Sequence, residues 1–186
     1  MFSFVKKLML GQKMQFNEGE ILLLDEPICL MPIRTVMDTT ANAKAGKRNA
    51  IYLAGKTSGA YWFEKITKRF YQDKMPAKDI IEWGNNIIAM AGYGISVLEK
   101  VNFDDKEIIF RLNNSTMFRI MGKSKKPIDD LYRGFVAGAG TVMLKEECDA
   151  VEIKCRAVDG DFCRFIVKPK GKFDRSDPVV KEQLEQ

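Results

Sequence analysis

Two cysteines flank a strong turn signal in the last third of the chain. Asp159-Gly160 is typical of a β-hairpin, and a three-residue loop that starts at Val158 places Cys155 directly opposite Cys163. Directly opposed Cβ atoms lie roughly 4.5–5.5 Å apart, which lets two thiolates share one metal ion. A two-residue loop shifts the register and puts the two thiols on opposite faces of the hairpin. A shared metal therefore depends on the three-residue loop.

Spacing alone leaves three interpretations of Cys155 and Cys163 open. They are small core residues, or they form a cross-strand disulfide, or they are half of a zinc site. The core interpretation is the first choice, because strand alternation places both on the face that carries Val151, Ile153, Phe165 and Val167. The same alternation points Glu152 away from Cys155, unless a β-bulge or the end of the strand intervenes.

The absence of histidine restricts the chemistry open to this chain of 186 residues, which has four cysteines. Ser-His-Asp and Cys-His catalysis and His-ligated zinc are excluded, so thiolates and carboxylates must supply any metal site. The net charge of +5 is mild and the basic residues form no stripe, which argues against nucleic acid as a partner. The sequence contains neither a phosphate-binding loop motif nor a dinucleotide fingerprint.

The hydrophobic period divides the chain into the helices and strands that must position these residues. It predicts helices over about 33–72, 76–92 and 127–143, and strands over 20–31, 95–103, 107–112, 116–121, 149–157 and 162–167. Pro32, Pro76 and Pro127 suit the first turns of the three helices. Because helices come early and strands late, we expect an α+β fold: an antiparallel sheet with several helices packed against it.

Gly55 and Gly59 lie four residues apart inside the first long helical segment. Each glycine costs a helix about 1 kcal/mol relative to alanine. The spacing puts both on one helical face, where another backbone can approach closely. We interpret this face as a site of tight helix packing or an interface rather than as a ligand site.

The organisation predicts one domain over residues 1–170 and a loose, charged tail over residues 171–186. The first ten residues lack the charged-then-apolar order of a secretory signal. The longest nearly apolar stretch, residues 87–98, has about 12 residues against the ~20 that a membrane span needs. We therefore expect a cytoplasmic protein, in which disulfides are rare.

Taken together, these motifs resemble the 4-vinyl reductase domain family. The resemblance rests on Gly134-Phe-Val-Ala-Gly138 and on Glu152-x-x-Cys155-x-x-x-x-Gly160-x-x-Cys163-x-Phe165. The Gly55-x-x-x-Gly59 helix and residues 83–94 also fit the family layout, so the resemblance covers roughly residues 33–168. The family includes stand-alone archaeal proteins thought to bind hydrocarbons, which this chain resembles, and the sensor portions of phenol-responsive bacterial regulators.

The resemblance implies an antiparallel sheet covered by helices, as in TRAPP vesicle-tethering subunits and NO-signalling domains, and a homodimer. In the sensor members of the family, one glutamate and three cysteines hold a structural zinc ion. Carried over by position, the hairpin ligands are Glu152, Cys155 and Cys163, and Asp129 stands where the sensors have the helix-start cysteine. The resemblance thus implies a zinc site in which a carboxylate replaces one thiolate.

Asp129 has two interpretations of equal weight. Zinc accepts a carboxylate oxygen at about 2.0–2.2 Å, so Asp129 can be the fourth ligand. Alternatively, Asp129 only starts a helix, where an acid complements the macrodipole, and pairs with Arg133 four residues on. Asp130 and Cys148 are spare ligand candidates, and Cys29 and Cys148 are otherwise expected to be core residues.

The family pocket lies between the helices and the sheet and takes apolar or aromatic molecules. The candidate ligand-binding residues are Trp62, Trp83, Tyr93 and Phe135, and further aromatic candidates are Tyr52, Phe110 and Phe118. Each of them also suits ordinary core packing. Phenol-sensing relatives hold the ligand hydroxyl with a histidine, so this chain is not expected to be a strict phenol sensor.

We therefore expect a non-enzymatic protein that binds or senses a small apolar, aromatic or hydrocarbon-like ligand and contains structural zinc. The alternative is a structural subunit of a larger assembly. A reductase of a tetrapyrrole vinyl group, or its accessory, ranks below both, because the chain has no fingerprint for a hydride-donating cofactor.

Overall fold

The computed structural model describes residues 2–30, 35, 48–71 and 77–185, and the chain divides into two compact units. The first unit, Met1–Asn42, contains helix α1 (Phe2–Leu10) and an antiparallel sheet of β1 (Met14–Asn17), β2 (Glu20–Leu23) and β3 (Glu26–Ile28). The single strand predicted over residues 20–31 is wrong, because Leu24 and Asp25 adopt positive φ angles of 53° and 64° and turn the chain between β2 and β3. Cys29, predicted to be a core residue, is exposed.

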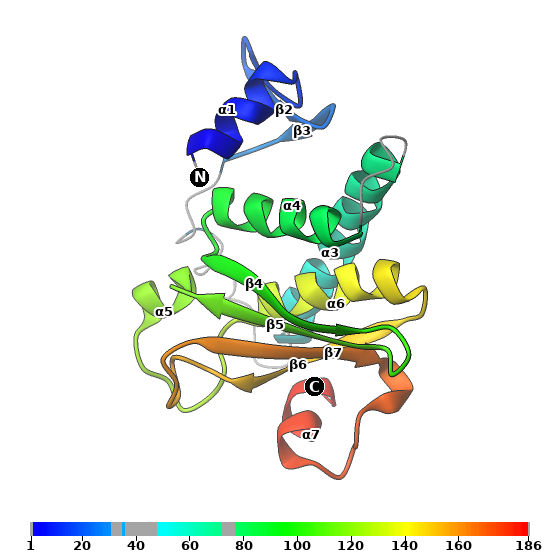
Figure 1. Cartoon of the computed structure of the whole chain (residues 1–186). Coiled ribbons are helices and arrows are strands. Elements are labelled where there is room, and N and C mark those ends of the chain that lie inside the picture. Colours follow the sequence, from blue (N-terminus) through cyan, green and yellow to red (C-terminus); the bar gives the residue numbers. More distant parts are fainter. Residues whose placement is uncertain (1, 31–34, 36–47, 72–76, 186) are drawn as a thin grey trace. The chain divides into compact units, whose positions relative to one another are not determined.

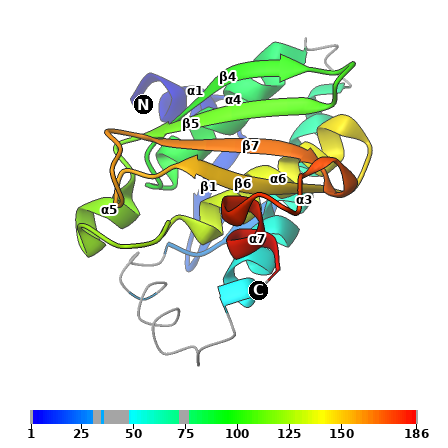
Figure 2. The ribbon, with the colours of Figure 1, turned by 90° about the horizontal axis from the view of Figure 1, so that it is seen from below.

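The second unit, Ala43–Gln186, is built on a four-stranded antiparallel sheet in the order β4-β5-β7-β6. Its strands are β4 (Ile95–Asn102), β5 (Glu107–Asn113), β6 (Cys148–Lys154) and β7 (Cys163–Pro169). Its helices are α3 (Arg48–Tyr71), α4 (Ala77–Met90), α5 (Thr116–Met121), α6 (Asp130–Leu144) and α7 (Pro178–Leu184), and a 3-10 turn follows β7 (Lys170–Lys172). Figures 1 and 2 show α3, α4 and α6 on one side of this sheet and α7 on the other. The predicted α+β class is confirmed.

The core of the second unit is the sheet face that the helices cover. Buried and half-buried side chains alternate along β5 and β7, as a sheet with one covered face requires. The buried rows are in register, with the pairs Ile108↔Val167, Phe110↔Phe165 and Leu112↔Cys163. Cys163 is therefore the last member of a continuous core row, at the end of the sheet nearest α5.

Helices α3 and α6 cross through glycines on both sides. A Cβ atom added to Gly59 would lie 2.0 Å from the carbonyl oxygen of Phe135, and one added to Gly138 would lie 2.0 Å from that of Lys56. Only glycine lets the two backbones approach this closely. The prediction that Gly55 and Gly59 form a helix-packing face is confirmed, and the partner is α6 of the same chain.

Three predicted elements differ from the structure. Residues 116–121, predicted as a strand, form α5, because the Ser115 hydroxyl caps the helix by accepting a hydrogen bond from the Phe118 N–H. The helix predicted from Pro127 begins three residues later, and the tail predicted as loose contains α7, where Val180 and Gln183 are buried. The predictions for residues 33–47, Pro76 and Gln72 lie outside the described residues. Within the described part of the chain, every helix is too short or too polar to span a membrane.

Candidate metal centre and apolar cavity

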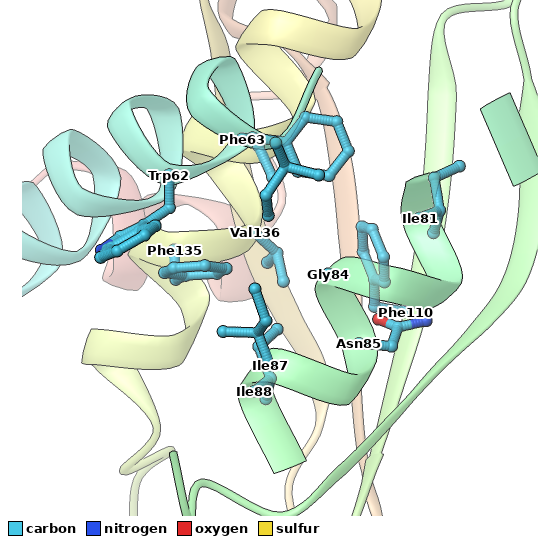
Figure 3. Close-up of a pocket in the computed structure, with 12 residues that line it drawn as sticks. Trp62, Phe63, Ile81, Gly84, Asn85, Ile87, Ile88, Phe110, Phe135 and Val136 are labelled. Carbon is cyan, nitrogen blue, oxygen red and sulfur yellow. The ribbon is translucent and has the colours of Figure 1, made fainter. Parts of the chain in front are cut away.

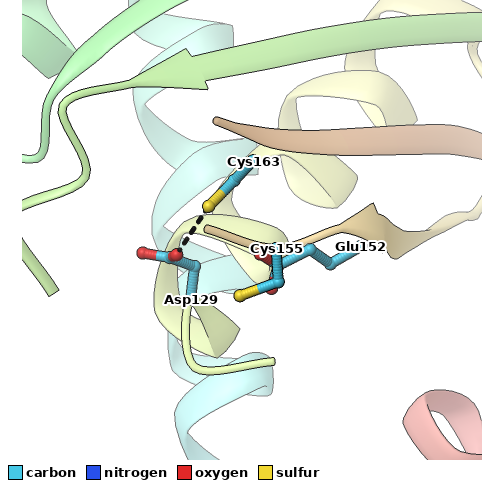
Figure 4. A group of neighbouring side chains, drawn as sticks. All are labelled: Asp129, Glu152, Cys155 and Cys163. Atoms are coloured by element: carbon cyan, nitrogen blue, oxygen red, sulfur yellow. Dashed lines mark hydrogen bonds between the residues drawn. The ribbon is translucent and has the colours of Figure 1, made fainter. Parts of the chain in front are cut away.

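Four ionisable side chains meet where the β6–β7 hairpin approaches the start of α6. Asp129, Glu152, Cys155 and Cys163 are all buried, and each offers a ligand atom within 4.8 Å of the other three. Figure 4 shows the four side chains turned toward one another, with Asp129 coming from the loop before α6 and the others from the hairpin. The residues carried over from the family motif thus form one cluster.

A β-bulge brings Glu152 into this cluster. Glu152 pairs with Phe165 and Lys154 pairs with Arg164, so Ile153 is an extra residue in β6. The bulge turns Ile153 outward, where it is 47% exposed, and leaves Glu152 2% exposed on the inner side. The prediction that Ile153 shares the core face of the cysteines is therefore wrong, and the exception allowed for Glu152 is the one that occurs.

The loop between the two cysteines is longer than the predicted three residues. Strand β6 ends at Lys154 and β7 begins at Cys163, and the Cys155 carbonyl accepts hydrogen bonds from the N–H groups of Val158, Asp159 and Gly160. The register that follows the bulge, Lys154↔Arg164, places Cys155 across from Cys163 when it is continued by one residue. The thiols therefore meet because of the bulge rather than because of a tight turn. All four cysteines are free thiols.

Asp129 occupies the N-cap position of α6, but its side chain makes no capping hydrogen bond. Its Oδ1 atom accepts a hydrogen bond from the Ser115 hydroxyl at 2.9 Å, and its Oδ2 atom accepts one from the Cys163 thiol at 3.2 Å. Arg133 pairs with Asp130, at 3.1 Å, and not with Asp129 as predicted. The Asp129 carboxylate is thus directed into the cluster, while Asp130 is engaged elsewhere.

Cys148, the other spare ligand candidate, lies at the opposite end of β6. Its thiol donates a hydrogen bond to the Glu146 carbonyl, and the residue is fully buried, which confirms the prediction that it is a core residue. Burial raises the pKa of this thiol to about 11. A protonated, buried thiol of this kind is inert toward metal ions.

Burial and crowding shift the pKa values of the four cluster groups. Burial raises the pKa of Asp129 to about 6 and raises the pKa of Glu152 well above its usual range. A hydrogen bond from Cys163 lowers the pKa of the Cys155 thiol to about 5, and donating that bond raises the pKa of Cys163. The cluster therefore gathers negative charge in a buried space, where a divalent cation would neutralise it.

The donor set fits a metal ion. Glu152 Oε1 is buried and has no hydrogen-bond partner among the described residues, although a buried carboxylate oxygen normally has one. The ligand atoms of a tetrahedral zinc ion with sulfur and oxygen ligands are roughly 3.3–3.8 Å apart. Since the four ligand atoms already lie within 4.8 Å of one another, small side-chain shifts suffice to close a shell.

A small apolar cavity lies between α3, α4, α6 and the covered face of the sheet. It leaves about 20 Å³ for the centre of a water-sized sphere, which is room for about one water molecule. Figure 3 shows aromatic and aliphatic side chains from the three helices and from β5 turned toward this space. The lining residues are Trp62, Phe63, Ile66, Ile81, Gly84, Asn85, Ile87, Ile88, Phe110, Phe135, Val136 and Ala139.

The polar side-chain groups of this lining are the Asn85 amide and the Trp62 indole N–H. The Asn85 amide is held by buried hydroxyls, because Ser96 Oγ donates to Asn85 Oδ1 at 2.7 Å and lies 2.7 Å from the Tyr132 hydroxyl. Tyr132 is itself buried, and its ring packs edge-on against Phe165. The cavity therefore offers a ligand an almost entirely apolar surface.

The predicted ligand-binding residues divide between the cavity and other places. Trp62 and Phe135, together with Phe110, line the cavity, whereas Trp83 and Tyr93 do not belong to its described lining. Tyr52 donates a hydrogen bond to Asp149, and Phe118 lies under the Arg156 guanidinium. Ile81 and Phe63 were not singled out by aromatic content; the helical period of α3 and α4 is the signal that could have found them.

Comparison with known proteins places these features in a family. A family model for the 4-vinyl reductase domain matches residues 108–169, a segment that contains the whole four-residue cluster. No curated protein matches the sequence. The chain is similar to the phenol-responsive sensory domain of the transcription activator PoxR, solved with phenol, at 15% identity over 98% of this chain and 96% of that one, with a TM-score of 0.77.

Two further solved structures share the fold. A vinyl-4-reductase family protein from Methanocaldococcus jannaschii is 16% identical over 76% of this chain and 83% of its own, with a TM-score of 0.53. A trafficking protein particle complex subunit 3 from Naegleria fowleri, covalently bound to palmitic acid, is 15% identical over 74% and 89%, with a TM-score of 0.50. The resemblance inferred from the glycine and cysteine motifs is confirmed: this chain contains a 4-vinyl reductase domain, over residues 108–169.

Proposed function

We propose that this chain is a non-enzymatic small-molecule-binding domain whose ligand occupies the cavity between α3, α4, α6 and the sheet. The observation that carries the proposal is the lining itself, which is almost entirely apolar and comes from three helices and one strand. Ligand sites are concave and mostly apolar, and they are often found between packed helices and a sheet. The shared fold with a sensory domain solved with phenol supports a binding or sensing role.

The expected ligand is a small apolar or aromatic molecule, such as a hydrocarbon. The cavity surface is almost entirely apolar and the Asn85 amide oxygen already accepts a hydrogen bond from Ser96, so a ligand hydroxyl would be buried without a partner. That costs about 1–3 kcal/mol. Because the cavity has room for about one water molecule, an arene enters only when side chains such as Trp62 and Phe135 move aside.

Toluene and phenol test this proposal, because they have nearly the same shape and differ in a methyl group against a hydroxyl. We expect toluene to bind about tenfold or more tightly than phenol, as measured by isothermal titration calorimetry, because of the buried hydroxyl. Ala139→Leu, which fills the cavity, is expected to abolish binding, whereas Ala91→Leu, at an exposed position after α4, is expected to leave it unchanged. Equal or tighter binding of phenol contradicts the ligand class, and absence of binding for both contradicts the binding role.

The second part of the proposal is that Asp129, Glu152, Cys155 and Cys163 hold a structural zinc ion. Two thiolates and two carboxylates make a chemically suitable shell for zinc, and Glu152 Oε1 lacks any other described partner. Bound there, the ion would tie the start of α6 to the β6–β7 hairpin and so stabilise the folded state. Since all four positions are then taken by protein, the role is structural rather than catalytic.

Helix α6 connects the two parts of the proposal. Asp129 precedes its first turn, and Phe135, Val136 and Ala139 on the same helix line the cavity. The homodimer implied by the family resemblance is also part of the proposal. The alternative role as a scaffold subunit loses one argument, because the glycine face of α3 is already covered by α6.

A further inference from the structure

Two buried polar side chains contact the cluster from outside its four residues. Ser115 is 0% exposed and comes from the N-cap of α5, and Gln183 is 4% exposed and comes from α7. Neither belongs to the motif that suggested the metal site. Each makes hydrogen bonds to a proposed metal ligand.

The Ser115 hydroxyl fixes the orientation of the Asp129 carboxylate. Its oxygen accepts the Phe118 N–H at 3.2 Å, so its one proton is free to be donated, and it goes to Asp129 Oδ1 at 2.9 Å. With Oδ1 held in this way, Oδ2 is the oxygen that faces Cys163, at 3.2 Å from the sulfur. Ser115 therefore selects which carboxylate oxygen points into the cluster (Figure 4).

The Gln183 side chain fixes the backbone of Glu152. Its Oε1 atom accepts the Glu152 N–H at 2.9 Å, and its Nε2 atom donates to the Glu152 carbonyl at 2.9 Å. The amide thus pairs with the edge strand β6 as a neighbouring strand would, at the residue where the bulge begins. This contact holds the bulge that turns the Glu152 side chain inward.

Resting on the metal site proposed above, we propose that Ser115 and Gln183 are positioning residues of the metal centre. Ser115 presents Asp129 Oδ2 to the ion, and Gln183 keeps the Glu152 carboxylate on the inner side of the bulge. Hydrogen bonds that orient ligands in this way typically change metal affinity about 10- to 100-fold. Through Gln183, the C-terminal helix becomes part of the metal centre.

The experiment measures zinc affinity of the full chain by competition with a chromophoric chelator. Ser115→Ala and Gln183→Leu are each expected to weaken zinc binding about 10- to 100-fold, while Ser115→Thr, which keeps the hydroxyl, stays close to the parent protein. Ser124→Ala is the control for serine, because Ser124 accepts a hydrogen bond only from the nearby Lys126 N–H. Val180→Ala is the control for α7, because it removes buried packing but leaves the Gln183 amide in place.

A merely structural role of the two residues gives a different result. Loss of the α5 cap or of α7 packing lowers the unfolding temperature of the zinc-free protein but leaves the zinc affinity of the folded protein unchanged. Zinc affinities of Ser115→Ala and Gln183→Leu within about threefold of the parent, well short of the expected loss, therefore overturn the inference, as does an equal loss of affinity in the two controls. A parent protein that binds no zinc refutes the proposed metal site itself, which is a separate outcome.

Discussion

Single residues show how little of the cluster is explained by their roles in secondary structure. Asp129 stands at a helix N-cap, where an aspartate side chain usually accepts a hydrogen bond from the first turn, yet it contacts Ser115 and Cys163 instead. Glu152 lies in a strand with its carboxylate buried and Oε1 unsatisfied within the described part of the chain. Both residues are costly in an apolar interior unless a cation compensates them.

Replacement of the cluster cysteines is expected to remove this compensation. Cys155→Ala should lower the free energy of unfolding of zinc-loaded protein by well over the ~1 kcal/mol of an average substitution, because lost metal binding is lost folding energy. Cys148→Ala is the matched control, since Cys148 is equally buried but lies outside the cluster. Urea denaturation with and without zinc measures both variants. A loss for Cys155→Ala no larger than that for Cys148→Ala favours the core interpretation of Cys155.

At the same scale, the sequence could supply the ligand set but not its geometry. The family motif identifies Glu152, Cys155 and Cys163, and position alone adds Asp129. The bulge at Ile153 could not be predicted, because it depends on how β6 pairs with β7 and on the Gln183 amide that holds its edge. Ser115 carried a readable signal, since it lies one residue before a helix and three before its N–H partner.

Helices and strands were predicted well where local chemistry and packing agree. The period and the glycines predict α3, α4 and α6, and the β4–β5 and β6–β7 pairs follow from alternation around turn residues. Helix α5 was missed because its six residues are rich in strand-forming types, although Ser115 and Gly122 cap its two ends. Helix α7 was missed because a charged tail gives no sign of the edge strand that it covers.

The crossing of α3 and α6 makes a prediction about the glycine face. Gly59→Ala and Gly138→Ala each add a methyl group about 2.0 Å from a carbonyl oxygen of the opposite helix, so the helices must separate. We expect each variant to lose about 1–3 kcal/mol of unfolding free energy or more in urea denaturation. Gly171→Ala, which meets no atom within 4 Å, is the control and should be close to neutral. Unchanged stability of both helix variants refutes the close crossing.

For the molecule as a whole, the cluster and the cavity belong to one unit and share α6. The net charge of +5 and the general composition said nothing about either site. The absence of histidine was more informative, because it required carboxylates in any metal shell, and two carboxylates lie in the cluster. The prediction of one domain over residues 1–170 was made from the same pattern and stays a prediction.

Native mass spectrometry of freshly purified, intact protein tests the central claim most directly, since it reads metal content and oligomer mass from one sample. The account predicts one zinc ion for each 21.2 kDa chain, in a dimer, and loss of that ion in Cys155→Ala but not in Cys148→Ala. A parent protein whose mass shows no bound metal, even after refolding with zinc, would contradict the account.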